Sequence, residues 1–165
     1  MLLRKLKESG ILDNYIDVLD WMFDDNKFDV EHGWSKGKVS KFTSKIKNYL
    51  EKIDCDYSFD EKNIVLLSKP KNSIVRINNS GSAGKNLVRN IRNGIAHRNF
   101  VIYYANKKMF FQTYDVTKNK KEKPVCSYIV LPIESLIEIY DIYLEIKKSI
   151  NNERHLKKKS SKKVM

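Results

Sequence analysis

Apolar residues recur at steps of three and four positions in several stretches of the chain, which is the spacing of one buried face of an α-helix. The period is clearest over residues 35–53, which we predict to be an amphipathic helix. A similar stretch covers residues 13–25, and another follows Ser82, a residue type suited to the N-terminal cap of a helix. The last begins at Pro132, a residue favoured in the first helical turn, and continues to about residue 150.

After residue 97 the pattern changes to short runs of β-branched and aromatic residues, which are typical of β-strands. We predict two strands, residues 100–105 and 109–116, around a short Asn-Lys-Lys turn, and a third strand over residues 126–131. The fold class that follows is mainly α. We expect a helical bundle with a small antiparallel β-sheet inserted between the helix after Ser82 and the last long helix.

The length and the charge of the chain indicate how many domains it has and which kinds of partner it suits. The 165 residues suit one domain, which we place at residues 1–150, followed by a basic tail, residues 151–165, that we expect to be disordered. Lys and Arg number 32 against 20 Asp and Glu, so the net charge is +12, which favours polyanionic partners such as nucleic acid. The longest apolar run, residues 100–105, is too short to span a membrane, and we see no secretory signal, so we expect a cytoplasmic protein without a membrane partner.

The helix after Ser82 carries the residues that are best suited to chemistry. Arg89, Asn93 and His97 follow one another at steps of four, and Arg92 precedes His97 by five positions, so all four are expected to face one groove. Gly94 keeps the helix surface low at this point. We expect this low surface to let another helix or a phosphodiester backbone come close.

Residues 92–97, Arg-Asn-Gly-Ile-Ala-His, resemble the motif of the HEPN superfamily, in which an Arg and a polar residue are followed by a short spacer and a His. Residues 97–100, His-Arg-Asn-Phe, with strands after them, are similar to a plasmid and prophage branch of this superfamily. The resemblance implies an HEPN-like core of four or five helices, a homodimer, and a composite site where two motifs meet. It also implies metal-independent ribonuclease activity, as in members from toxin, antiphage and CRISPR-associated systems, with no cofactor and no metal.

RNA cleavage of this kind suits these residue types because RNA carries its own nucleophile, the 2′-hydroxyl group. His97 is expected to accept the hydroxyl proton, because imidazole is the side chain most often used as a general base near neutral pH. Arg92 offers a planar, charged fork for two phosphate oxygens, and Asn93 is expected to orient His97 or the phosphate. Arg89 and Arg98 are expected to bind RNA phosphate. The predicted products carry a 2′,3′-cyclic phosphate, and DNA is expected to be spared.

We therefore predict a dimeric endoribonuclease with catalytic Arg92, Asn93 and His97, acting as a defence or toxin effector. Its expected partners are RNA, a second copy of the chain and a cognate inhibitor or antitoxin. An alternative is a non-catalytic module of the same fold that binds RNA, nucleotides or another protein.

A second alternative is a metal-dependent nuclease. The first predicted helix carries an acidic stripe that could hold magnesium, made of Asp13, Asp17, Asp20 and Asp24. A solvated helix face is the favoured interpretation, because no further acid cluster or His is placed to complete a metal site. Cys55 and Cys126 belong to no Cys-x-x-Cys pair, so we expect neither a disulfide nor a zinc site, and two buried or inert thiols.

Overall fold

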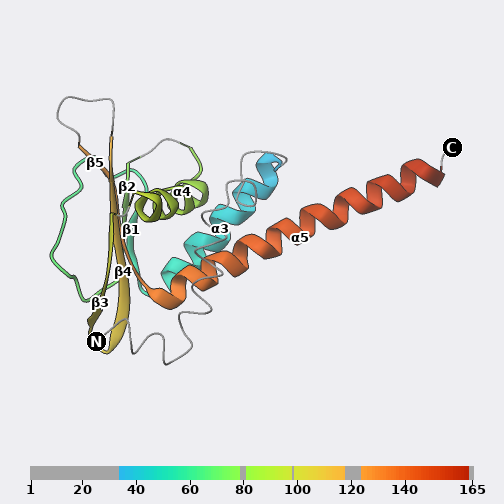
Figure 1. Ribbon diagram of the computed structural model, residues 1–165. Coiled ribbons are helices and arrows are strands. Elements are labelled where there is room, and N and C mark those ends of the chain that lie inside the picture. The colour runs from blue at the N-terminus through green and yellow to red at the C-terminus, as the bar shows by residue number, and fades with distance from the viewer. Residues whose placement is uncertain (1–33, 79–80, 98, 118–123, 164–165) are drawn as a thin grey trace.

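A five-stranded mixed β-sheet forms the centre of the protein (Figure 1). The computed structural model describes residues 34–78, 81–97, 99–117 and 124–163, so the helix predicted over residues 13–25 lies outside the described residues. The strands follow the order β1–β2–β5–β4–β3 across the sheet. Their bounds are Asp56–Ser58 for β1, Ile74–Ile77 for β2, Phe100–Ala105 for β3, Lys108–Val116 for β4 and Val125–Pro132 for β5. β1 and β2 are parallel, whereas every other pair of neighbours is antiparallel.

The predicted fold class is wrong, because the sheet is not a small insertion in a helical bundle. β1 and β2 precede the helix after Ser82, and β2 pairs with β5, so the sheet draws on both halves of the described chain. The sequence pattern missed these two strands because they have only three and four residues, too few for alternation to stand out. The architecture is a sheet with helices α3, α4 and α5 packed on one face (Figure 1).

The helical periods nevertheless located these three helices correctly. α3 spans Lys36–Lys52, and its N-cap Ser35 accepts a hydrogen bond from the backbone N–H of Lys38. α4 spans Ala83–Ala96, directly after Ser82. α5 spans Ile133–Lys163, so Pro132 ends β5 rather than opening the helix. The three strands predicted after residue 97 are confirmed as well.

The main core lies between the helices and one face of the sheet. Strand residues on that face include Val75, Ile77, Phe111, Ile129 and Leu131. The helices contribute fully or almost fully buried side chains, among them Phe42, Ile46, Leu50, Leu87, Ile91, Leu136, Ile139, Tyr143 and Ile146. Each such side chain removed from water contributes roughly 1.5–3 kcal/mol, so this layer provides most of the stability of the described fold.

The opposite face of the sheet is covered by the connection between β1 and β2, residues 61–73 (Figure 1). Two tyrosines of that face hold the connection through their hydroxyl groups. Tyr103 Oη donates to the carbonyl of Pro70 at 2.6 Å, and Tyr128 Oη donates to the carbonyl of Leu67 at 3.1 Å. Burial, followed by the neighbouring Tyr128, raises the pKa of Tyr103 to about 12, so this donor stays protonated at neutral pH.

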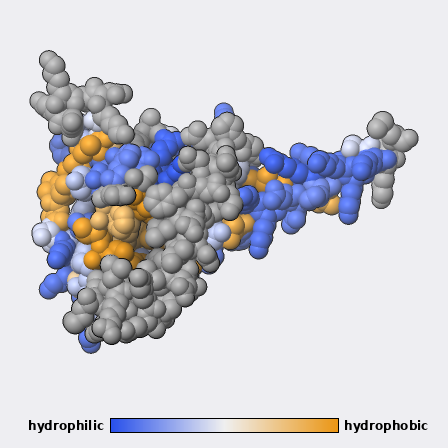
Figure 2. Space-filling model, viewed as in Figure 1, coloured by the Kyte–Doolittle hydropathy of each residue, from blue (hydrophilic) through white to orange (hydrophobic). Residues whose placement is uncertain are grey.

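Helix α5 continues past its expected end near residue 150 and projects from the rest of the described structure (Figure 1). Two contacts of Lys38 Nζ fasten the base of the projection, one with Ser149 Oγ at 2.7 Å and one with Glu153 Oε1 at 2.8 Å. Beyond them every described side chain up to residue 162 is exposed, and the surface is hydrophilic (Figure 2). The expected disordered tail is therefore helical through Lys163. No helix among the described residues has the length and apolar character to cross a membrane.

Candidate functional site

The last turn of α4, which carries the Arg-His motif, is fixed to strand β4 by two contacts. Asn93 Nδ2 donates to Asp115 Oδ2 at 3.3 Å, and Asp115 Oδ1 accepts from the backbone N–H of Val116 at 3.0 Å. One residue further on, a Cβ atom added to Gly94 would lie 1.7 Å from Thr113 Oγ1. Helix and strand therefore approach so closely that no side chain fits at position 94.

The expected use of Gly94 is thereby corrected. The low helix surface admits the protein's own strand β4, not RNA or a second helix, because Thr113 already occupies the space. Thr113 is fully buried, and its hydroxyl donates to the carbonyl of Asn99 at 2.8 Å. This hydrogen bond also holds the chain just after the helix, so the motif lies on a well-anchored element.

Asn93 also differs from the expectation, because its amide donates to Asp115 and makes no contact with His97 through its side chain among the described residues. Asp115 is only 8% exposed, so the hydrogen bond satisfies a carboxylate that would otherwise be costly to bury. We therefore regard Asn93 as a positioning residue. The sequence of β4 contained a sign that Asp115 would be the partner of Asn93. Alternation along the strand places Asp115 on the same face as the core residue Phe111, where a polar side chain is unusual.

His97 caps the C-terminal end of α4. Its backbone N–H donates to the carbonyl of Asn93 at 2.9 Å, and the N–H of Asn99 closes the turn on the carbonyl of Gly94 at 2.8 Å. The His97 side chain is exposed, and no hydrogen bond or ion pair joins the imidazole to another described residue. The anchored backbone thus presents an imidazole that no other described residue binds.

The cationic residues of α4 lie along a different side of the helix from His97. Lys85, Arg89 and Arg92 follow steps of four and three, which places them in one row; Arg89 is exposed and the other two are half-buried. Five residues of an ideal helix turn by about 140° beyond a full circle, so Arg92 and His97 leave α4 in clearly different directions. Ideal helical spacing thus separates Arg92 from His97 on a single chain, and a groove shared by all four motif residues stays a prediction. Arg98 lies outside the described residues.

One buried hydroxyl beside this site lacks a partner. Ser127 stands opposite Asp115 in the β4–β5 register, on the helix side of the sheet. Its Oγ is fully buried and has no hydrogen-bond partner among the described residues. Ser127 and Asp115 thus lie near Asn93 and Thr113 in one polar cluster at this end of the sheet.

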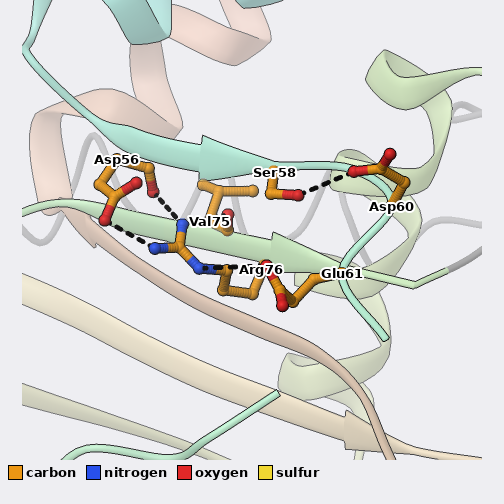
Figure 3. Close-up of polar contacts among 6 residues, drawn as sticks. All are labelled: Asp56, Ser58, Asp60, Glu61, Val75 and Arg76. Atoms are coloured by element: carbon orange, nitrogen blue, oxygen red, sulfur yellow. Dashed lines mark hydrogen bonds and ion pairs between the residues drawn. The ribbon is translucent and has the colours of Figure 1, made fainter. Parts of the chain in front are cut away.

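A second polar cluster joins strands β1 and β2 (Figure 3). Arg76 donates to the carbonyl of Asp56 at 2.7 Å and to its Oδ2 at 2.6 Å, and it lies 4.0 Å from Glu61 Oε2. A cavity of about 380 Å³ opens beside it, lined also by Ile74 and Tyr128. Because the guanidinium is already engaged by two carboxylates, this cluster fastens a short parallel strand pair and offers no free cation to a ligand.

The larger cavity, about 760 Å³, lies at the N-terminal end of α4 and is lined by Trp34, Thr43, Phe59 and Ser82, among others. There Ser82 Oγ and Thr43 Oγ1 are 2.6 Å apart and bonded to each other, which explains why Ser82 does not cap α4 with its side chain. The motif is at the other end of a 14-residue helix, roughly 20 Å away. His97 therefore does not line this cavity.

The described residues contain no group of three His, Cys, Asp or Glu that could hold a metal ion, and the predicted acidic stripe lies outside them. Both thiols are held protonated. Burial, followed by the adjacent Asp56, raises the pKa of Cys55 to about 12. Burial, followed by Asp115, also raises the pKa of the half-buried Cys126. Neither thiol is thus suited to act as a nucleophile near neutral pH.

Comparison with known proteins adds no relative: no family model, no curated protein and no solved structure matches this chain.

Proposed function

We propose that the protein is an endoribonuclease that needs no metal, and that its active site combines His97 of one copy with Arg92 of a second copy. The observation that carries the proposal is the exposed imidazole at the anchored end of α4, which makes no hydrogen bond or ion pair with another described residue. The chemistry is the one that the Arg-His motif suggests, whereas the fold is the sheet with helices on one face and not a helical bundle. We place Arg92 and His97 on different copies because five positions along an ideal helix turn the side-chain direction by about 140°.

The reaction needs only proton transfer and charge stabilisation. His97 removes the proton of a ribose 2′-hydroxyl group, and the 2′-oxygen attacks the adjacent phosphorus. The bond from phosphorus to the 5′-oxygen breaks, and this oxygen takes a proton from the solvent to which the site is open. Arg92 of the second copy binds the non-bridging phosphate oxygens as their charge increases. The products carry a 2′,3′-cyclic phosphate and a 5′-hydroxyl group.

The test is cleavage of labelled RNA by the purified full-length protein with and without EDTA. His97→Ala should lower the rate by about 10²–10⁴-fold, the usual contribution of a general base. Arg92→Ala should lower it by about 10²–10³-fold. Lys71→Ala, an exposed residue of the connection over the other sheet face, removes a cation as a matched control and should leave the rate unchanged. A substrate with a single ribonucleotide in DNA should be cut only there.

Mixing the two inactive variants tests the composite site. If one site takes Arg92 from one copy and His97 from the other, a mixed dimer contains one intact site. Random pairing of equal amounts should therefore restore about a quarter of the wild-type rate, since half of the dimers are mixed and each has one of two sites. Cleavage that persists in His97→Ala, or that stops with EDTA, would refute the proposal. RNA binding without cleavage by the wild type would favour a non-catalytic binding protein.

A further inference from the structure

We propose that the projecting part of α5 is an RNA-docking surface, separate from the motif of α4. The identity of the ligand rests on the proposed function. The surface consists of residues 147–162, which we call the α5 projection. The projection contains one acid, Glu153, and seven cationic residues: Lys147, Lys148, Arg154, Lys157, Lys158, Lys159 and Lys162. Every described side chain from residue 151 to residue 162 is exposed.

The helix arranges these charges in rows. Lys147, Arg154, Lys158 and Lys162 are separated by seven, four and four positions, so they follow one side of the helix over roughly 22 Å. Lys148 and Lys159 belong to a second row, about 100–120° around the helix from Lys147. A rigid row of cations of this length matches the repeating charge of a phosphate backbone, which a flexible tail would match only after losing entropy.

The free projection carries an electrostatic cost that a polyanion would remove. Arg154, Lys158 and Lys162 are like charges four positions apart, a spacing that destabilises an isolated helix. Their position near the C-terminal end favours the helix through its dipole, which partly offsets the repulsion. Phosphates beside the row would neutralise the repulsion and leave the dipole interaction in place. RNA binding should therefore strengthen the helix as well as attach the RNA.

Two other occupants fit less well. A membrane surface requires an apolar face beside the cations, but Leu156 is the only apolar side chain in residues 151–162, and it lies on the side opposite Lys147. A second copy of the projection would bring like charges together. The charge pattern therefore favours RNA.

The test measures binding separately from cleavage, using full-length protein and a labelled RNA in which every ribose is 2′-O-methylated, so that 2′-hydroxyl attack cannot occur. The variant carries Lys158→Gln, Lys159→Gln and Lys162→Gln, which remove charge but keep a good helix former. The matched control carries Lys62→Gln, Lys71→Gln and Lys108→Gln, three exposed lysines of the sheet domain, so both proteins lose the same net charge. Anisotropy is recorded over a range of salt concentrations, and circular dichroism verifies the fold.

The α5 variant should bind at least about tenfold more weakly than the wild type near 0.1 M salt. Its plot of log affinity against log salt should lose about two units of slope, since each lost phosphate contact removes about 0.7 for a single strand. The control should change affinity by less than about threefold. Equal weakening in both variants would overturn the proposal, because net charge alone would explain it. Displacement of the RNA by vesicles containing phosphatidylserine would also overturn it and assign the surface to membranes.

The experiment distinguishes a failure of the docking surface from a failure of the ribonuclease proposal. A wild-type protein that binds the methylated RNA through α5 but cleaves no ordinary RNA would refute only the catalytic role of His97. If the wild type cleaves RNA but the α5 variant binds the methylated RNA with unchanged affinity, only the docking surface would be refuted.

Discussion

The side-chain amide of Asn93 donates to the carboxylate of Asp115, and this hydrogen bond of 3.3 Å joins the motif helix α4 to strand β4, which lies between β5 and β3 in the sheet. The residue beside the motif arginine is therefore used to place the helix, and His97, one turn further, inherits that placement. Any chemistry at His97 depends on a contact that lies behind it, between the helix and the sheet.

The first prediction follows from this contact. Asn93→Ala should lower the free energy of unfolding by about 1–3 kcal/mol, because the buried Asp115 carboxylate loses a hydrogen-bond donor. Denaturant unfolding measures the change. Asn48→Ala, the same change at an exposed position of α3, should stay within about 0.5 kcal/mol. Equal losses in both variants would mean that the contact with Asp115 adds nothing.

A methyl group at position 94 should be more harmful than its size suggests. Gly94→Ala places a carbon 1.7 Å from Thr113 Oγ1 and 2.8 Å from Thr113 Cβ, so α4 must shift away from the sheet, and we expect a loss of about 3 kcal/mol. Adding Thr113→Gly should recover part of this loss. Gly37→Ala is the matched control: its new Cβ has only Ser35 Oγ at 3.9 Å near it, and the change should stabilise the protein by up to about 1 kcal/mol. Thermal and denaturant unfolding compare the three variants.

The tyrosine hydroxyl groups should control the opening of residues 61–73. Tyr103→Phe removes the donor to Pro70, and Tyr128→Phe removes the donor to Leu67, so local opening of this connection should become easier. Brief trypsin treatment should then cut faster after Lys62 and Lys71, as followed by mass spectrometry. Tyr114→Phe, at an exposed tyrosine of β4, should leave the cleavage rate at its wild-type value.

Acid should weaken the contact between α3 and α5. Hydrogen bonds from Lys45 and Lys38 hold the pKa values of Glu145 and Glu153 below their usual 4.5. Because the folded pKa values are lowered, the stabilisation is present above about pH 4.5 and is lost as the pH falls through the folded values. A variant with Glu145→Gln and Glu153→Gln should therefore show a flatter dependence of unfolding free energy on pH below this point.

The comparison for that experiment is a variant with Glu134→Gln and Glu138→Gln, which neutralises two exposed acids elsewhere on α5. Since both ion pairs are at the surface, about 1 M salt should remove most of the difference between the wild type and the Glu145 and Glu153 variant. A difference that persists in high salt would point to packing rather than charge.

Sequence periodicity predicts elements well where one face is long and regularly buried, as in α3 with Phe42, Ile46 and Leu50. It fails for β2, whose four residues form a strand because β5 lies beside them, some fifty positions later in the chain. It also cannot set the end of α5, because the Lys-rich residues after 150 have no buried face to give a period.

In the candidate site too, the sequence predicts the helix but not the contacts of its side chains. The motif correctly indicated that Arg92, Asn93 and His97 belong to one helical segment that ends at His97. Helical spacing alone could not indicate which neighbour each side chain would meet, because that depends on a strand that follows the helix. Asn93 therefore looked available for RNA, although it is engaged by Asp115.

The pairing of β2 with β5 sets an order of assembly. β3, β4 and β5 follow one another, so their hairpins close short loops, whereas Ile77 must find Ser127 across two intervening strands. On the ribosome, β2 can pair only with the short strand β1 until residues near 130 have left the exit tunnel. The edge formed by β1 and β2 is therefore the last part to join the sheet, and the β2–β5 contact is also where the mature sheet should begin to open.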